Sequence, residues 1–304
     1  MKRSIAILLT FLLLLGMEAF AGPRAAHAEI TNSQPDESDK TALIDAVSKV
    51  KEAKSLRYDT GITMELAMKI SAQGMNMEMP IRVNMTFGMD IQTDPYLVRG
   101  DLAMDMDMGL YGSQSQHTTL YATQDGERMI AYSSSDEGAS WTAQENENLR
   151  ALLPGEAFDL LLAHAQDIRR TGTDTFRDEQ VAVYTCRMEG RFIDQVMTTT
   201  GMDGMLSQIT GGDEAATDPS EISDIPVTFY IDSDGYIVYY TMDMTEAMKG
   251  MLAAAMQNLM GTTDMEGMEI TVDIPLIRGE CTLCDFDAVA PFAIPEAALN
   301  APEA

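Results

Sequence analysis

The sequence predicts an α+β protein built around a long, curled antiparallel β-sheet. Apolar side chains occupy every second position from Met75 to Ile91, and a period of two marks a strand with one apolar and one polar face. The same alternation runs through 62–70 and 102–108. Typical strands have ~5–6 residues, so strands this long cannot stay flat and should form a strongly twisted sheet. Helical segments are interspersed without a βαβ alternation, which indicates antiparallel strands.

The individual elements follow from local periodicity. Leu43, Val47 and Val50 recur at helical spacing, and Phe158 with Leu161 marks a second helix. In chain order we expect a helix at 41–54, strands at 56–72, 75–91, 96–110, 117–123, 128–133 and 140–143, a helix near 158–165, strands at 167–172 and 180–188, a helical stretch from 190, a loop at 210–224, a hairpin at 226–244, a helix at 245–260 and a last strand at 266–277 that can extend to 286.

Two acidic turns are predicted to close hairpins. Asp125-Gly126 is a strong hairpin signal between two short strands. Asp232 and Asp234 resemble the start of a calcium-binding loop, but the glycine comes two positions early and Tyr236 stands where the third oxygen ligand would be. We therefore interpret 232–235 as a hairpin turn and expect no metal site there.

The first 28 residues predict a Sec-type secretory signal peptide. A basic start precedes an apolar run from Ile5 to Leu15, and Ala26-His27-Ala28 has the small-x-small pattern of a cleavage site. Cleavage after Ala21 and retention as an anchor are the alternatives. We expect a protein secreted to the extracellular face of the cell envelope, with a signal peptide at 1–28, a flexible linker at 29–40, one domain at 41–297 and a tail at 298–304.

The chain is strongly acidic, with 48 Asp and Glu against 20 Lys and Arg and a formal charge of −28. Such a surface repels phosphate backbones, so nucleic acid is excluded as a partner. Solubility is the simpler explanation of the charge, because repulsion prevents the edges of a long sheet from pairing with other chains. We expect a monomer.

Three cysteines, Cys186, Cys281 and Cys284, are compatible with an oxidising compartment, but an odd number leaves one unpaired. Cys281 and Cys284 have the spacing of redox motifs. That chemistry needs the first cysteine at a helix N-terminus, whereas the segment after Cys284 is acidic and extended in pattern. We expect a structural role, with Cys186 bridged to one of the pair or all three reduced.

The sequence gives little sign of catalysis. His117 and His164 are the only histidines outside the predicted signal peptide, and nothing places them together. The Ser48-x-x-Lys51 spacing occurs in penicillin-binding enzymes, but the companion motifs are missing. Glycine-rich phosphate loops and nucleophile elbows are also absent from the sequence. We therefore expect no enzyme activity and no cofactor.

Methionine is unusually frequent in this chain, with 25 residues. Three interpretations are open. Methionine can fill an irregular core between sheet and helices, or line a cavity that adapts to ligands of variable shape. Thioethers also suit Cu(I), although such sites usually place methionine with histidine or cysteine at an accessible rim.

A resemblance to a known family points in the same direction. The order of a signal peptide, a polar tether, an amphipathic helix ending in Val50-Lys51-Glu52-Ala53-Lys54-Ser55-Leu56 and long alternating strands resembles the LolA-like lipoprotein-carrier superfamily. The hairpin Tyr121–Trp141 and the ending from Cys284-Asp285-Phe286 to Ile294-Pro295-Glu296 are similar to a group of secreted, usually lipid-anchored Gram-positive proteins without an assigned activity. The cysteine that carries the lipid anchor in that group is missing here.

The resemblance implies a curved antiparallel β half-barrel over 41–297, with helices covering its concave face. It also implies a non-enzymatic carrier of lipids or lipoproteins, or a sensor of the envelope. We therefore expect a secreted binding protein that holds a lipid acyl chain or other apolar ligand between sheet and helices. The alternatives are an interaction or sensor module with a packed core, which recognises an envelope protein, and a Cu(I) binder. The candidate cavity lining is Met64, Met68, Met77, Met79, Met85, Met104 and Met106.

Overall fold

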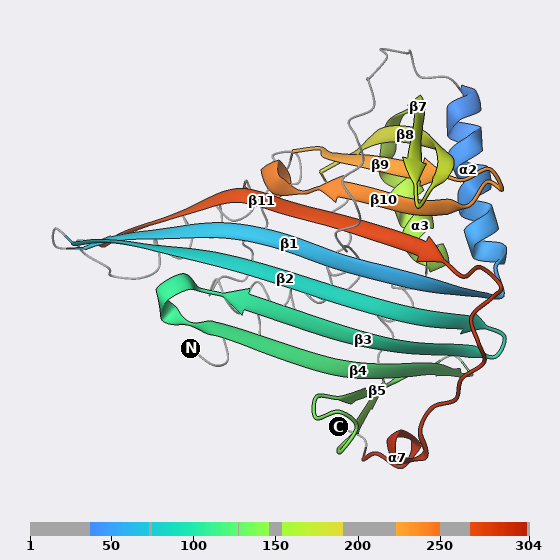
Figure 1. Cartoon of the computed structure of the whole chain (residues 1–304), viewed down its shortest axis with the longest axis horizontal. Helices are drawn as coiled ribbons and strands as arrows, with labels where there is room; N and C mark the ends of the chain where they lie inside the picture. The colour runs from blue at the N-terminus through green and yellow to red at the C-terminus, as the bar shows by residue number, and fades with distance from the viewer. Residues whose placement is uncertain are drawn as a thin grey trace.

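The chain folds around one large antiparallel sheet (Figure 1). The computed structural model describes residues 37–72, 75–126, 128–145, 154–190, 223–249 and 268–302. Its eleven strands have the order β6-β5-β4-β3-β2-β1-β11-β10-β9-β8-β7, so the described strands leave the sheet open between β6 and β7. This confirms the predicted α+β class with an open, curved antiparallel sheet.

The helices and strands occur in the following places. They are α2 (Glu37–Glu52), β1 (Ser55–Ala72), β2 (Met75–Thr93), β3 (Tyr96–Asp107), the 3₁₀ turn η1 (Gly109–Tyr111), β4 (Ser113–Asp125), β5 (Arg128–Ser134), β6 (Thr142–Glu145), α3 (Pro154–His164), β7 (Ala165–Phe176), β8 (Glu179–Met188), β9 (Ile225–Ile231), β10 (Ile237–Asp243), β11 (Met268–Cys284) and α7 (Glu296–Leu299).

Three long strands form the centre of the sheet. β1 pairs with β2 along its whole length and with β11 on its other side, where one bulge shifts the register between Glu65 and Ala67. The pairing of β2 with β3 stops at Arg82 and Asp107. Among the described strands, none pairs with the distal part of β2 on this side, and Pro80 lies there, where its missing N–H costs no ladder hydrogen bond. β1, β2 and β11 project beyond their neighbours at this end (Figure 1).

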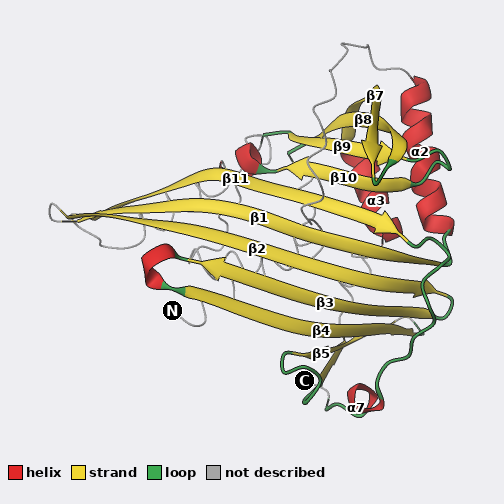
Figure 2. Cartoon of the chain, viewed as in Figure 1, coloured by secondary structure: helices red, strands yellow, loops and turns green. Residues whose placement is uncertain are grey.

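The two faces of the sheet differ in the way the alternation predicts. One face, here called the inner face, carries buried side chains such as Ile62, Met64, Val83 and Met85. The helices α2 and α3 pack at one end of it (Figure 2). Their buried side chains Leu43, Ala46, Val47, Val50, Phe158 and Leu161 join the inner-face residues in a single hydrophobic core.

Residues 285–302, here called the C-terminal strap, cross the opposite or outer face (Figure 1). The Asp287 N–H donates to the Ser55 carbonyl at 2.8 Å, and Gln92 Nε2 donates to the Ala290 carbonyl at 3.4 Å. At the far edge of the sheet, Ala298 of α7 is fully buried in a small cluster with residues of β5 and β6. The strap thus ties the centre of the sheet to its β5–β6 edge.

Several predicted boundaries were wrong by a few residues. The first helix begins at Glu37, inside the predicted linker. The acidic side chains of Glu37 and Asp39 lie in its first turn, where they stabilise the positive end of the helix dipole. The third strand ends at Asp107 instead of 110, since Gly109 has a φ of 58° and turns the chain into η1. Trp141 precedes β6 and donates from its indole to the Gly138 carbonyl at 3.1 Å.

Some sequence predictions lie outside the described residues. These are the signal peptide and most of the linker (up to residue 36), the helical stretch from 191, the loop from 210 to 222, and the predicted helix beyond residue 249. Within the described ranges, no helix combines the length and the hydropathy that a membrane crossing needs.

Candidate functional site

Four of the seven candidate methionines lie side by side on the inner face. The backbone register places Met64 opposite Val83, and Val83 opposite Met106 on the next strand. Two residues further along β2, Met85 pairs with Met104 on β3. The four methionine side chains Met64, Met85, Met104 and Met106 are each at most 6% exposed. The sheet therefore gathers them into one continuous apolar surface, here called the methionine face.

The end of the inner face nearest the helices is closed by specific packing. Tyr58 and Tyr240 share a buried hydrogen bond of 2.9 Å between their hydroxyl groups. The ring of Phe158 from α3 lies 5.5 Å from the ring of Tyr240. The ring contact and the hydroxyl hydrogen bond hold these side chains in place, so they close this end of the inner face.

The opposite end of the inner face opens toward solvent. Met79 is half-buried and Met77, two residues further along β2, is 42% exposed. The Met68 side chain lies outside the described ones, but its backbone pairs with Met79. One stripe of apolar residues on β2 thus runs without interruption from the buried core to an exposed end. Whether these residues line a cavity stays a prediction.

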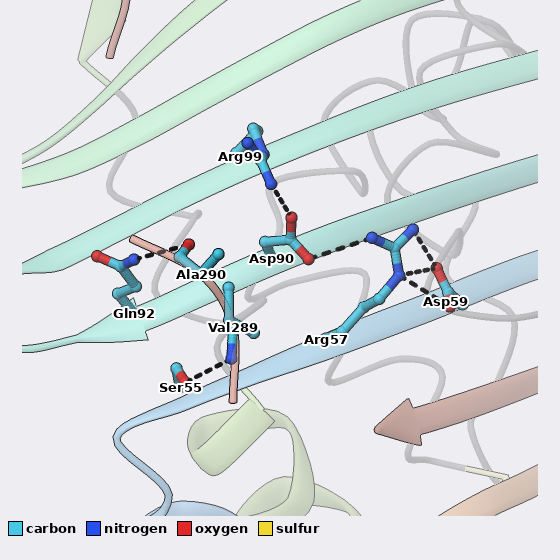
Figure 3. A network of polar contacts seen from close by, with 8 residues as sticks. All are labelled: Ser55, Arg57, Asp59, Asp90, Gln92, Arg99, Val289 and Ala290. Carbon is cyan, nitrogen blue, oxygen red and sulfur yellow. Dashed lines mark hydrogen bonds and ion pairs between the residues drawn. The ribbon is translucent and has the colours of Figure 1, made fainter. Parts of the chain in front are cut away.

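A polar network stiffens the outer face of the sheet at the end nearest the helices (Figure 3). Asp90 accepts hydrogen bonds from Arg57 at 3.2 Å and from Arg99, and its side chain is only 10% exposed. Arg57 Nε also donates to Asp59 at 3.1 Å, and this hydrogen bond raises the pKa of Arg57. Arg99 in turn lies over the ring of Phe292 in the strap, 4.8 Å from its centroid.

The cysteines have the inert environment expected of structural residues. All three are reduced thiols, which agrees with the fully reduced alternative. Burial raises the pKa of the Cys186 thiol to about 12. Burial also raises the pKa of Cys284, which lies on the outer face near Arg177. Because the thiolate is the reactive form, neither environment favours redox chemistry at neutral pH.

The acidic turn at 232–235 is a hairpin turn, as predicted. The Asp232 side chain accepts a hydrogen bond from the Tyr236 N–H at 2.8 Å, and the Lys49 ammonium group binds the Asp234 carbonyl. The positive charge of Lys49 at this carbonyl would repel a metal cation. In the part of the chain that the structure describes, no group of three His, Cys, Asp or Glu side chains is placed to hold a metal ion.

Sequence reasoning missed two features of the sheet, one near each end. The first is the Asp90 network, because residues 33 positions apart meet only through the register of β1 with β2. The second is η1, where Leu110 is fully exposed and Tyr111 is 53% exposed. The pattern Gly109-Leu110-Tyr111-Gly112, two large apolar residues between glycines, is the signal that could have revealed it.

The comparison with protein families gives one assignment. Residues 40–302 match the family described as a family of unknown function, DUF6612. The chain belongs to this family. Comparison with curated proteins gives no match.

Solved structures with a similar chain course include two mycobacterial proteins and one from a Vibrio species. LprF from Mycobacterium bovis has 11% identity and a TM-score of 0.45, covering 88% of this chain and 100% of LprF. LppX from Mycobacterium tuberculosis has 11% identity and a TM-score of 0.37, covering 84% and 98% of the two chains. A putative outer membrane lipoprotein-sorting protein domain from Vibrio parahaemolyticus has 9% identity and a TM-score of 0.17, covering 78% and 90%. At TM-scores below 0.5, these likenesses identify neither a superfamily nor a ligand.

Proposed function

We propose that this DUF6612 protein is a non-enzymatic binding protein that holds an apolar ligand, such as a lipid acyl chain, against its methionine face. The observation that carries the proposal is the uninterrupted apolar stripe of β2. It leads from Val83, which is 1% exposed, through half-buried Met79 to Met77, which is 42% exposed. A packed core alone has no need of an apolar path that continues into solvent.

The dimensions of the stripe suit a long chain molecule. Successive residues of a strand rise ~3.4 Å, so Val83 and Met77 lie ~20 Å apart along β2. Burial gains ~0.8 kcal/mol per methylene, and ten methylenes would contribute ~8 kcal/mol before the costs of ordering the ligand. Flexible, polarizable methionine side chains can adapt to such a ligand without a fixed shape.

One observation supports a second candidate, an interaction module with a packed core. Met64, Met85, Met104 and Met106 already belong to the single hydrophobic core together with the helix residues. If no ligand enters, the acidic outer face would be the surface that recognises an envelope protein. The two candidates differ in one measurable property, the response of the fold to an apolar ligand.

The test is thermal unfolding of the mature chain with added fatty acids of increasing length. We expect the melting temperature to rise with chain length, because each added methylene buries more apolar surface in the folded state only. Met79→Asp should abolish the rise, since a carboxylate in the stripe would have to be desolvated by the ligand. Asn84→Asp is the matched control, because Asn84 is exposed on the outer side of the same strand. An unchanged melting temperature with every fatty acid contradicts the carrier and leaves the interaction module.

We further propose that the protein acts as a monomer at the extracellular face of the cell envelope, after removal of the predicted signal peptide. Sequencing the N-terminus of secreted material should give Glu29 as the first residue. Material that keeps the apolar run from Ile5 to Leu15 and sediments with membranes would contradict this part of the proposal.

A further inference from the structure

Exposed apolar side chains gather at the distal end of the sheet. Among the described residues, five large hydrophobic side chains are exposed, and three of them, Met77, Leu110 and Tyr111, belong to this end. Leu110 and Tyr111 form the turn η1 between β3 and β4, and the Tyr111 hydroxyl donates to Met77 Sδ at 2.7 Å. These three residues are here called the apex.

The backbone holds the apex outward. Gly109 begins the turn and Gly112 follows it, with φ values of 58° and 99°, a backbone region that residues other than glycine rarely adopt. Gly109 rests on the distal part of β2, where a Cβ would lie 3.3 Å from Pro80 Cγ. The chain thus reverses in a tight turn braced against β2, and Leu110 projects fully into solvent. Such exposure of a large apolar residue on a braced turn suggests an interaction surface.

The apex also joins the ends of two apolar stripes. On β3 the stripe runs through Met104 and Met106 to half-buried Met108, directly before η1. On β2 the stripe ends at Met77, which contacts Tyr111. An apolar molecule that follows either stripe from its distal end therefore passes the apex.

We propose that the apex docks on the surface of a lipid bilayer, from which the ligand is taken up or to which it is delivered; this rests on the proposed function. Leu110 is fully exposed on this turn, so it can enter a soft apolar phase without a preformed protein pocket. A tyrosine beside a leucine has the amphipathic character of residues at a membrane interface.

The surrounding charges select the type of lipid surface. The two cations described on the distal parts of β1 and β2 are each paired with a carboxylate, because Lys69 lies 3.8 Å from Glu78 and Arg82 lies 2.8 Å from Glu65. The adjacent Asp107 adds a negative charge, and the whole chain carries −28. Anionic headgroups would be repelled, so the geometry points to a neutral, zwitterionic lipid surface.

The experiment is flotation of the mature chain with vesicles of phosphatidylcholine, alone or with phosphatidylglycerol. We expect binding to pure phosphatidylcholine and weaker binding at low salt when the anionic lipid is added. Leu110→Asp should reduce the bound fraction at least ~10-fold, because the leucine contact is lost and a charge must approach the apolar phase. Leu299→Asp is the matched control, since Leu299 is 54% exposed on α7, away from the apex, and should bind like the unmodified chain (Figure 2).

Equal binding of the Leu110→Asp and unmodified chains would overturn the proposal, as would a failure of the unmodified chain to float. A dimer that Leu110→Asp converts to a monomer would also overturn it, because the apex would then be a contact between two copies. Fatty acid supplied as monomers without vesicles separates the two proposals. Leu110→Asp should still bind it, whereas a chain that floats but binds no fatty acid contradicts the proposed function alone.

Discussion

The Asp90 network offers a sharp test of what stabilises the outer face of the sheet and the C-terminal strap. In Asp90→Asn the side chain keeps its shape but loses its charge, so Arg57 and Arg99 lose the carboxylate that they share. Arg57 keeps a second partner in Asp59 at 3.1 Å, whereas the Arg99 guanidinium retains only its contact with the Phe292 ring among the interactions described above. We expect a clear loss of stability together with a loosened strap.

The magnitude follows from the exposure of the three groups. Breaking a fully buried ion pair costs ~3–5 kcal/mol, and an exposed pair contributes only ~0–1 kcal/mol. Here the Asp90 side chain is 10% exposed while Arg57 and Arg99 are 42% and 41% exposed, so water can still solvate the remaining cations. We therefore expect the free energy of unfolding to fall by about 2 kcal/mol, between the two limits.

Equilibrium unfolding in urea at pH 7 measures this change. The control is Asp101→Asn, because Asp101 also lies on the outer face, on β3, but its side chain is 62% exposed. Loss of its charge should lower the free energy of unfolding by less than ~0.5 kcal/mol. Limited proteolysis should also cut the strap of Asp90→Asn faster than that of the control. A loss below ~0.5 kcal/mol for Asp90→Asn, or a loss that disappears in 1 M salt, would refute the idea of a desolvated network.

Two further predictions concern packing and thiol chemistry. Gly100→Ala should destabilise the chain by ~1–3 kcal/mol in urea unfolding, since the new Cβ would lie 3.1 Å from the Gly88 carbonyl oxygen, and an unchanged midpoint would contradict this packing. Iodoacetamide at pH 8 should label half-buried Cys284 first and leave Cys186 unlabelled in the folded chain, because burial raises the Cys186 pKa to about 12. After unfolding without a reductant, mass spectrometry should count three labels, including Cys281, and a smaller count would reveal a disulfide.

The strands could be predicted because apolar and polar residues alternate along them in the sequence. The alternation from Met75 to Ile91 defines both the strand and its inner face, and the structure buries Met85 and exposes Asn84 accordingly. The start of β4 was missed because 113–116 is Ser-Gln-Ser-Gln and has no apolar alternation. These residues are extended because their backbone pairs with β3, as Ser113 does with Asp107.

The site could be predicted only in part, for two physical reasons. The grouping of Met64, Met104 and Met106 follows from long strands that share one apolar face, and the sequence reveals that face directly. The Asp90–Arg57 contact depends on the register of two strands, and a shift of one residue would place the groups on opposite faces. Cavity volume likewise depends on how side chains from several elements fill space, which periodicity does not report.

The most direct test of the carrier function is native mass spectrometry of the secreted chain, purified without detergent. The proposal predicts a mass increase from one bound apolar molecule, which organic extraction removes and added fatty acid restores. Met79→Asp should carry less of this molecule per folded chain than Asn84→Asp. Bare protein in every preparation, with no mass increase after fatty acid is added, would contradict the carrier function.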